Sequence, residues 1–281
     1  MRFSFRVCYN YVMDKTLTFK IEREMTIREY LRQNFSSTIS IKIKKEGLIF
    51  VNGERRDARH TLKIDDELKL TLKETLSPFP ITKQMDVKPI YEDEDVLVVF
   101  KGENVPCMPT KKHFENNLFC GLNYLYPNEV FRIVTRLDKD TKGLVLIAKN
   151  SLCHSLFGET NITKKYRAIL KGKLEKSVTV SAPIMRVEPG IKRIVSSKGK
   201  PATTIFNLVG YTSDENSVVD IELLTGRTHQ IRVHSAHIGH PVLNDSLYGD
   251  GQGEYNSGQE LTCYYLKFLH PFTKKEIEIK V

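Results

Sequence analysis

The hydrophobic positions in the first quarter of the chain predict a small unit of helices and strands. Thr26 and Glu29 have the spacing of a capping box, which predicts a short helix that begins between them. A second helix is predicted over residues 36–45, where Gly47 would end it. Isoleucine also occupies every second position over 39–43, so a strand at this place remains an alternative.

Alternating apolar residues predict strands in the same unit. Residues 48–51 form an apolar run that leads into Asn52-Gly53, a pair typical of tight hairpin turns. Leucines alternate with polar residues over 68–72 and predict a partner strand. Residues 3–7 also alternate, which is a strand period and not the apolar core of a secretion signal.

Two prolines then interrupt the pattern, and we interpret residues 76–88 as a linker. Beyond it, turn signals such as Glu188-Pro189-Gly190 separate short apolar runs, and helical stretches are few. The strands predicted from these runs are Val96–Phe100, Leu144–Ala148, Tyr166–Leu170, Thr203–Val209, Val218–Leu223 and Tyr264–Leu269. The pattern predicts an α+β fold with two domains, 1–75 and 89–281, the second built on a mixed, mainly antiparallel β-sheet.

Composition indicates a folded protein. Of the 281 residues, 40% are hydrophobic and 27% are charged, which is enough apolar mass for packed cores. No apolar run approaches the ~20 residues that would cross a bilayer, and we predict a cytoplasmic protein without a membrane segment. The five cysteines are scattered and form no Cys-x-x-Cys pair, so we expect buried thiols rather than disulfides or a zinc site.

The charge is positive and unevenly distributed. The chain carries a net charge of +9, and residues 1–75 hold 16 Lys plus Arg against 11 Asp plus Glu, a net of +5. Basic residues in this part cluster within 42–45 and 55–59. Such clusters can bind the phosphates of a nucleic acid, although a solvated surface is the alternative.

A resemblance favours nucleic acid. The run from Thr26 through Gly47, with Val51-Asn52-Gly53 and residues 63–66, resembles the small S4-like RNA-binding domain. Ser36-Ser37-Thr38 departs from it, where that domain has an arginine-rich helix start. The resemblance implies that the helix pair and the turn present basic side chains to RNA, here Lys42, Lys45, Arg55 and Arg56.

One loop in the second domain is unlike ordinary core sequence. Residues 132–149 place arginines, two aspartates and a glycine directly before an apolar strand. Loops held on the end of a rigid strand are where catalytic groups are often found. A plain turn is the alternative, with Asp138 or Asp140 capping backbone amides and Gly143 supplying a permissive dihedral angle.

Three motifs give this loop a specific resemblance. Residues 136–138, with Asp140-Thr141 and Gly143-Leu144, are similar to the signature loop of the RluA-type pseudouridine synthases, which isomerise uridine to pseudouridine in ribosomal and transfer RNA. Lys165-Tyr166-Arg167-Ala168 is similar to the second motif of this family. Residues 226–234 are similar to its third motif, so the three occur in the family's order.

The resemblance implies an RNA pseudouridine synthase. The reaction of this family needs no cofactor and no metal, because no electrons enter or leave. Asp138 matches the catalytic aspartate of the family, and Tyr166 matches the tyrosine that stacks on uracil. Arg227, at the start of a predicted helix, matches the arginine that pairs with the aspartate. Further residues expected to contact the RNA are Arg136, Thr141, Lys165, His229 and Gln230. The expected partner is ribosomal RNA first and transfer RNA second, bound by a monomer.

The chain departs from the family pattern around these motifs. Thr135 stands where the family has histidine, and Lys142 stands where it has serine. Residues 100–104 replace an Asn-Lys-Pro-Ala-Gly turn, and residues 243–246 replace a Gly-Asp-Pro run. Since these positions shape the rim of the site, we expect them to affect the choice of substrate more than the type of reaction.

Two other functions are alternatives. A metal-dependent hydrolase would use the histidines between 229 and 240, but on a helix His229 and His234 would point ~140° apart, and His240 follows Gly239, where the helix should end. A non-catalytic RNA-binding or ribosome-assembly factor could use the same fold. Only a test of turnover separates that factor from the enzyme, because both would bind RNA with a steep salt dependence.

Overall fold

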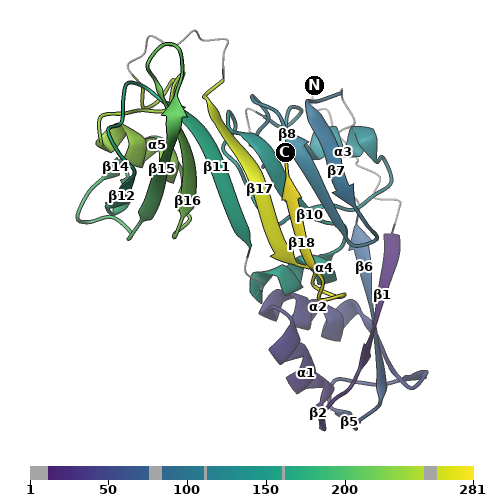
Figure 1. Cartoon of the computed structure of the whole chain (residues 1–281). Helices are drawn as coiled ribbons and strands as arrows, with labels where there is room; N and C mark the ends of the chain where they lie inside the picture. The colour runs from purple at the N-terminus through teal and green to yellow at the C-terminus, as the bar shows by residue number, and fades with distance from the viewer. Residues whose placement is uncertain (1–11, 76–83, 111–112, 160–161, 250–257) are drawn as a thin grey trace.

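The computed structural model describes residues 12–75, 84–110, 113–159, 162–249 and 258–281, and two β-sheets organise them (Figure 1). A four-stranded sheet with two helices forms the N-terminal unit, and a ten-stranded, mainly antiparallel sheet forms the rest. The predicted α+β class is therefore confirmed. The strand predicted within residues 3–7, like Cys8, lies outside the described residues.

The N-terminal unit is a four-stranded antiparallel sheet in the order β1-β6-β3-β4, with a separate β2-β5 pair. Its elements are β1 (Val12–Lys20), β2 (Met25–Thr26), α1 (Ile27–Asn34), α2 (Ser37–Glu46), β3 (Leu48–Val51), β4 (Glu54–Arg55), β5 (Thr61–Leu62) and β6 (Glu67–Thr75). Strands β3 and β6 are the pair that the leucine alternation predicted.

Both predicted helices form. The N–H of Glu29 donates to the Thr26 hydroxyl at 3.2 Å, and the N–H of Thr26 donates to the Glu29 carboxylate at 2.8 Å, which is the predicted capping box. The alternative of a strand over the isoleucines is wrong. Ile39 and Ile43 pack into the core one helical turn apart, whereas Ile41, between them, is 49% exposed.

The second part of the chain is one large sheet in the order β12-β15-β16-β11-β17-β10-β8-β7, to which β18 and β9 add at β17 and β10. All six strands that the apolar runs predicted are present. Its strands are β7 (Val87–Glu92), β8 (Val96–Lys101), β9 (Arg132–Ile133), β10 (Lys142–Ala148), β11 (Thr163–Leu170), β12 (Val178–Ser181), β15 (Thr203–Tyr211), β16 (Ser217–Leu223), β17 (Leu261–Leu269) and β18 (Glu276–Lys280). A hairpin of β13 (Ile184–Arg186) and β14 (Arg193–Val195) stands apart from it.

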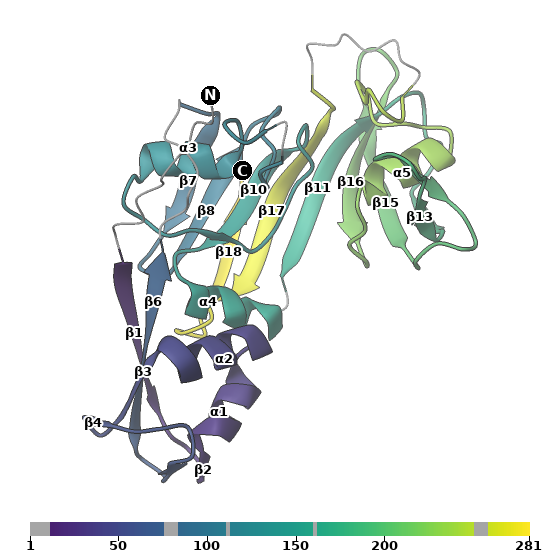
Figure 2. The ribbon, with the colours of Figure 1, turned by 180° about the vertical axis from the view of Figure 1, so that it is seen from behind.

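The helices of this part are α3 (Leu118–Leu125), α4 (Ser151–Leu156), the 3-10 turn η1 (Phe157–Glu159) and α5 (Gln230–His237). Helix α5 packs beside β14 and β15 (Figure 1), and Figure 2 shows the same helix from behind. Strand β7 begins at Val87, so the predicted linker is too long at its C-terminal end. The thiols of Cys107, Cys120, Cys153 and Cys263 are buried, as expected.

Helix α4 joins the two parts of the molecule (Figures 1 and 2). Leu152 of α4 is completely buried in the hydrophobic core of the N-terminal unit. The carboxylate of Glu74, at the end of β6, accepts hydrogen bonds from the N–H of Ser151 at 2.5 Å and from its hydroxyl at 2.8 Å. Arg132 of β9 approaches the same carboxylate to 3.2 Å. The N-terminal unit is thus fixed to the large sheet by apolar packing and a buried carboxylate.

Candidate active site

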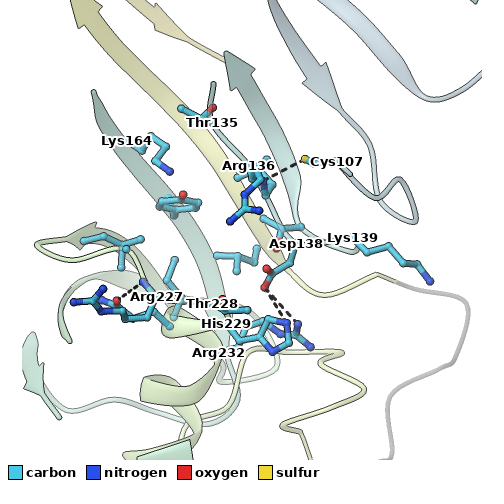
Figure 3. A pocket seen from close by; sticks show the side chains of 18 of the residues that line it. Cys107, Thr135, Arg136, Asp138, Lys139, Lys164, Arg227, Thr228, His229 and Arg232 are labelled. Atoms are coloured by element: carbon cyan, nitrogen blue, oxygen red, sulfur yellow. Dashed lines mark hydrogen bonds and ion pairs between the residues drawn. The ribbon is translucent and has the colours of Figure 1, made fainter. Parts of the chain in front are cut away.

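The loop between β9 and β10 carries Asp138 into a cavity of about 840 Å³ (Figure 3). Two hydrogen bonds fix the backbone just before it. The hydroxyl of Thr135 accepts the N–H of Leu146 in β10 at 2.9 Å, and the N–H of Leu137 donates to the Cys107 sulfur at 3.3 Å. The loop is therefore held against the rigid sheet on the side from which Asp138 enters the cavity.

A buried lysine supports the same loop from the end of β8. Lys101 has no exposed surface, and its ammonium group donates to the carbonyl oxygens of Lys139 at 2.9 Å and Gly102 at 2.8 Å. Burial lowers the pKa of Lys101 to about 8, although the nearby carboxylates of Asp140 and Asp138 act in the opposite direction. Because Lys139 follows Asp138 directly, this contact fixes the backbone after the aspartate.

The glycine of the first motif is required by close packing. Gly143 has a φ of +123°, and a Cβ atom on it would lie 2.2 Å from the carbonyl oxygen of Cys263 in β17. Strands β10 and β17 pair in parallel at this point. Gly143 thus allows the strand that follows the Asp138 loop to join the centre of the sheet.

Arg232 of α5 is the arginine that meets Asp138, with Nη1 at 3.5 Å from the carboxylate (Figure 3). Two further nitrogens of Arg232 donate to both oxygens of Asp245, each at 2.7 Å. The Asp245 carboxylate also accepts the N–H groups of Leu247 at 2.9 Å and Tyr248 at 3.0 Å. Burial alone would raise the pKa of Asp245, but Arg232 holds it below its usual value. The guanidinium group is thus a rigid positive charge beside Asp138.

His229 approaches Asp138 from the start of the same helix. Its Nε2 lies 3.9 Å from the Asp138 carboxylate, and its Nδ1 lies 2.8 Å from the hydroxyl of Tyr248. Burial lowers the pKa of His229, whereas the negative charge of Asp138 raises it. His229 is one of the predicted site residues, and the structure places it in the cavity wall.

Tyr166 of β11 lines the cavity and is only 5% exposed. Burial raises the pKa of its hydroxyl well above 10, so the ring is neutral at physiological pH. Lys164, two residues earlier, lines the cavity from the same face of the strand. Lys165 faces the other side, 3.8 Å from Glu222 and 5.3 Å from the centre of the Tyr265 ring. Lys165 therefore lies outside the cavity wall and its contact with RNA stays a prediction, whereas Lys164 lines the cavity.

The predicted pairing of Arg227 with Asp138 is also wrong. Figure 3 shows the Arg227 side chain pointing away from Asp138, and its Nε donates to the carbonyl oxygen of Pro201 at 3.0 Å. The physical reason is the start of α5, which lies at Gln230 and not at Arg227. Arg227 therefore belongs to the turn before the helix, and Arg232 is the arginine on the face of α5 that points toward Asp138.

The amide of Gln230 is fully used inside the protein. Its oxygen accepts from the Arg227 N–H and the Thr225 hydroxyl, both at 2.9 Å. Its nitrogen donates to the carbonyl oxygen of Thr203 and the hydroxyl of Thr204, both at 3.0 Å. Since both acceptor sites and both donor hydrogens are occupied, the predicted contact of Gln230 with RNA would have to break one of these hydrogen bonds. Gln230 instead fixes the turn before α5.

Two further predicted residues lie at the cavity. Arg136 is exposed and reaches into the cavity beside Asp138 (Figure 3). Thr141 is 3% exposed, and its hydroxyl accepts a hydrogen bond from the Gln259 amide. Thr141 thus closes the loop against the start of β17, with its side chain in the cavity wall.

The basic residues predicted in the N-terminal unit lie apart from the cavity. The ammonium group of Lys42 donates to the carbonyl oxygen of Lys73 at 3.0 Å, and Arg56 pairs with Glu54. Lys45 and Arg55 are exposed and make no ion pair with another described residue. The charged groups of Lys42 and Arg56 thus already have partners within the protein, whereas those of Lys45 and Arg55 face the solvent.

The histidines of the third motif have separate partners. The ring of His234 is buried between the Thr204 hydroxyl and the carbonyl oxygen of Ala182, each at 2.8 Å. His240 lies 2.9 Å from the carbonyl oxygen of Lys171. Within the described ranges, no three His, Cys, Asp or Glu side chains form a group that could hold a metal ion.

The sequence reasoning missed Arg232, Asp245, Lys101 and Tyr248. Arg232 lies within the third motif, and Asp245 lies within the run that replaces Gly-Asp-Pro, so motif positions were available as a signal for both. Nothing in the sequence indicated that Lys101 is buried or that the Tyr248 hydroxyl reaches His229. Those two contacts depend on the tertiary fold.

Comparison with known proteins identifies the class that this fold and carboxylate site define. The family described as RNA pseudouridylate synthase matches residues 95–237. The "Uncharacterized RNA pseudouridine synthase YjbO" of Bacillus subtilis is 34% identical over 266 residues, covering 90% of this chain and 93% of the relative. The "Ribosomal large subunit pseudouridine synthase D" of Buchnera aphidicola is 33% identical over 254 residues, covering 81% and 79%.

A solved structure is similar as well. "Human RNA Pseudouridylate Synthase Domain Containing 1" superposes with a TM-score of 0.59 at 29% identity, over 73% of this chain and 86% of that one. This chain belongs to the RNA pseudouridylate synthase family, and it is an isomerase that acts on RNA. In the described part of the chain, no helix is long and apolar enough to span a bilayer.

Proposed function

We propose that this protein isomerises specific uridines of ribosomal RNA and that Asp138 is its catalytic carboxylate. One observation carries the assignment. Asp138 is a partly exposed carboxylate in the wall of the cavity, beside an arginine that Asp245 locks in place at two distances of 2.7 Å. A nucleophile or base must be held still, and the fixed guanidinium group of Arg232 lies 3.5 Å from the carboxylate to do so.

The chemistry requires one carboxylate at the sugar. The bond from C1′ to N1 breaks, the uracil turns, a bond from C5 to C1′ forms, the proton on C5 leaves, and N1 gains a proton. No electrons enter or leave, so the balance requires neither a redox cofactor nor a metal. Asp138 can attack C1′ or take the proton from C2′, and in either case Arg232 stabilises its carboxylate at 3.5 Å.

The cavity provides room and a platform for the base. A volume of about 840 Å³ lies within the range typical of sites for small molecules, and it accommodates a flipped nucleotide. We assign Tyr166 as the ring on which uracil stacks, because its raised pKa makes the hydroxyl a poor unaided base. Arg136 enters the space that the flipped base leaves in the RNA.

We further propose that residues 1–75 are an S4-like RNA-binding domain attached to a catalytic domain of residues 89–281. The exposed charges of Lys45 and Arg55 support this role, since each can contact a phosphate without breaking an ion pair to another described residue. Glu74 and Leu152 fix the unit to the catalytic part, so its basic face keeps a constant position relative to the cavity. The name of the Buchnera relative supports ribosomal RNA as the target. We place the reaction in the cytoplasm and assign it to a monomer.

The test is release of tritium from C5 of labelled uridine in transcripts of ribosomal and transfer RNA. Wild-type protein should release tritium from ribosomal RNA, and Asp138→Asn should reduce the rate by at least ~10³-fold, because it removes the group that attacks C1′ or takes the C2′ proton. Asp140→Asn is the matched control, since this carboxylate lies in the same loop but outside the cavity wall. If wild-type protein binds RNA but releases no tritium from the ribosomal transcript, the proposed target is refuted.

A further inference from the structure

The hydroxyl of Tyr248 links the β13–β14 hairpin to the neighbourhood of Asp138. It accepts a hydrogen bond from the backbone N–H of Arg193, the first residue of β14, at 2.9 Å. It also lies 2.8 Å from Nδ1 of His229, whose Nε2 faces the Asp138 carboxylate at 3.9 Å. The Tyr248 hydroxyl and the His229 imidazole thus connect the backbone of the hairpin with the Asp138 carboxylate.

The donors along this path determine the tautomer of the imidazole. The Arg193 N–H can only donate, so the Tyr248 oxygen accepts there and has one hydrogen left to give. We assign that hydrogen to the contact with Nδ1 of His229, which is then the acceptor. In the neutral ring the hydrogen therefore sits on Nε2, the nitrogen that faces Asp138.

The surroundings of His229 keep the ring neutral and in place. Charged side chains face it from every neighbouring element: Asp138 from the loop, Arg232 from α5, Arg193 from β14 and Asp245 from the turn after α5. Burial and the two arginines lower the pKa of His229, which outweighs the two aspartates.

The backbone and the neighbouring ring restrict His229 further. It has a φ of 58°, in the left-handed region, directly before α5. The rings of His229 and Tyr248 meet edge to face with centres 5.6 Å apart. A strained residue with a fixed ring orientation is typical of a functional position.

We propose that Tyr248 and His229 act as a positioning relay in which the Tyr248 hydroxyl sets the tautomer of His229 and the Nε2 hydrogen aligns the Asp138 carboxylate. This inference rests on the proposed function, because it assigns a task in that reaction. Nη1 of Arg232, at 3.5 Å, and Nε2 of His229, at 3.9 Å, then face Asp138 as a charged and a neutral donor, and the longer His229 contact tightens to a hydrogen bond when RNA is bound. Neither Tyr248 nor His229 needs to touch the substrate, so both are positioning residues.

Tyr248→Phe tests the relay with little change in packing, since the ring stays in contact with Arg232, whose guanidinium carbon lies 5.1 Å from the ring centre. Without the hydroxyl, the tautomer with hydrogen on Nδ1 becomes accessible and turns a lone pair toward Asp138. We expect kcat for tritium release to fall about 10-fold at pH 8, the effect of losing about one hydrogen bond, with KM for RNA within about twofold.

The pH profile distinguishes the relay from a structural role. As the pH falls from 8 to about 5, below the lowered pKa of His229, protonation of the ring restores hydrogen on Nε2 in the variant, so the ratio of wild-type to variant kcat should shrink toward one. A variant that was only less stable would keep a constant or growing ratio. Tyr211→Phe is the matched control, because its hydroxyl donates to the carbonyl oxygen of Leu174 at 2.8 Å, outside the cavity.

Substitution of the histidine gives a second measurement. The amide nitrogen of glutamine can replace Nε2, whereas that of asparagine reaches only as far as Nδ1. His229→Gln should therefore keep kcat within about threefold of wild type, and His229→Asn should lose about 10-fold. Equal loss in both variants would contradict the assignment of Nε2 as the donor.

The outcomes separate this inference from the function on which it rests. If wild-type protein turns over uridine and Tyr248→Phe matches it within twofold from pH 5 to 8, the relay is overturned and the proposed function stands. Parallel pH profiles with a lower kcat in the variant would also overturn the relay. If the wild-type protein releases no tritium, the proposed function fails, and the relay fails with it.

Discussion

Replacement of Arg232 by lysine tests which arginine serves Asp138. In the wild-type protein, Arg232 makes two hydrogen bonds of 2.7 Å to Asp245 and a contact of 3.5 Å to Asp138. A lysine keeps the charge but has a single ammonium group, so it cannot bind both oxygens of Asp245 and also reach Asp138. The substitution therefore removes the arrangement of hydrogen bonds around Asp245 and Asp138 and leaves the net charge unchanged.

The expected magnitude follows from these contacts. Arg232 holds the Asp138 carboxylate in position, and a misplacement of a catalytic group by about 1 Å can cost about 10²-fold in rate. Since the Arg232 contact with Asp138 is already 3.5 Å long, we expect kcat to fall by about 10- to 100-fold, which is about 1.4–2.8 kcal/mol of activation free energy. Loss of one charge-assisted hydrogen bond to Asp245 should also lower the free energy of unfolding by about 1.5–3 kcal/mol.

The assay is single-turnover release of tritium at saturating protein, with urea unfolding of the same samples. Arg227→Lys is the matched control, because Arg227 is exposed and, among the described residues, the hydrogen bond of its guanidinium group goes to the carbonyl oxygen of Pro201 and not to Asp138. We expect this control to keep kcat within about threefold. A large loss in Arg227→Lys together with a small loss in Arg232→Lys would refute the assignment of Arg232.

Two further predictions concern buried charged residues other than Asp138, namely Lys101 and Glu74. Between about pH 8 and pH 10.5 the unfolded chain keeps a proton on Lys101 that the folded protein has released, so this residue should make the free energy of unfolding rise with pH across that window. Urea unfolding should show the rise in the wild-type protein relative to Lys101→Met, and a constant difference between the two would contradict the lowered pKa. Glu74→Ala leaves the buried N–H of Ser151 without an acceptor and should cost about 1–3 kcal/mol in thermal unfolding. Glu67→Ala, at a carboxylate that is 51% exposed, should cost less than about 1 kcal/mol, and equal costs would mean that Glu74 does not fix the two parts together.

Local patterns predicted most of the regular structure. The capping box at Thr26, the Asn52-Gly53 turn and the long apolar strands depend on residues close in sequence, and all of them are present. Strands as short as β9 and β13 carry too few residues to show a period. The parallel pairing of β10 with β17 joins segments more than 100 residues apart, and no local pattern encodes it.

The site was predictable in its motifs and less so in its geometry. Asp138 and Tyr166 lie in the cavity wall as the resemblance implied. The choice between Arg227 and Arg232 depends on the residue at which α5 begins, because each residue turns a helix by about 100°. Asp245 reaches Arg232 from an irregular turn that only the folded chain brings near.

The strand period separates the two lysines of the second motif. Adjacent residues of a strand face opposite sides, so a strand that directs Tyr166 into the cavity also directs Lys164 there and turns Lys165 away. Of these two residues, Lys164 is thus the one placed to meet a nucleotide in the cavity.

Mapping of pseudouridine in ribosomal RNA from cells with and without this protein tests the central claim most directly. Deletion should abolish pseudouridine at one or a few positions, and wild-type protein should restore it there. Asp138→Asn, produced at the same level, should restore none. Unchanged ribosomal RNA in the deletion strain, or full restoration by Asp138→Asn, would contradict the account of a ribosomal RNA synthase that depends on the Asp138 carboxylate.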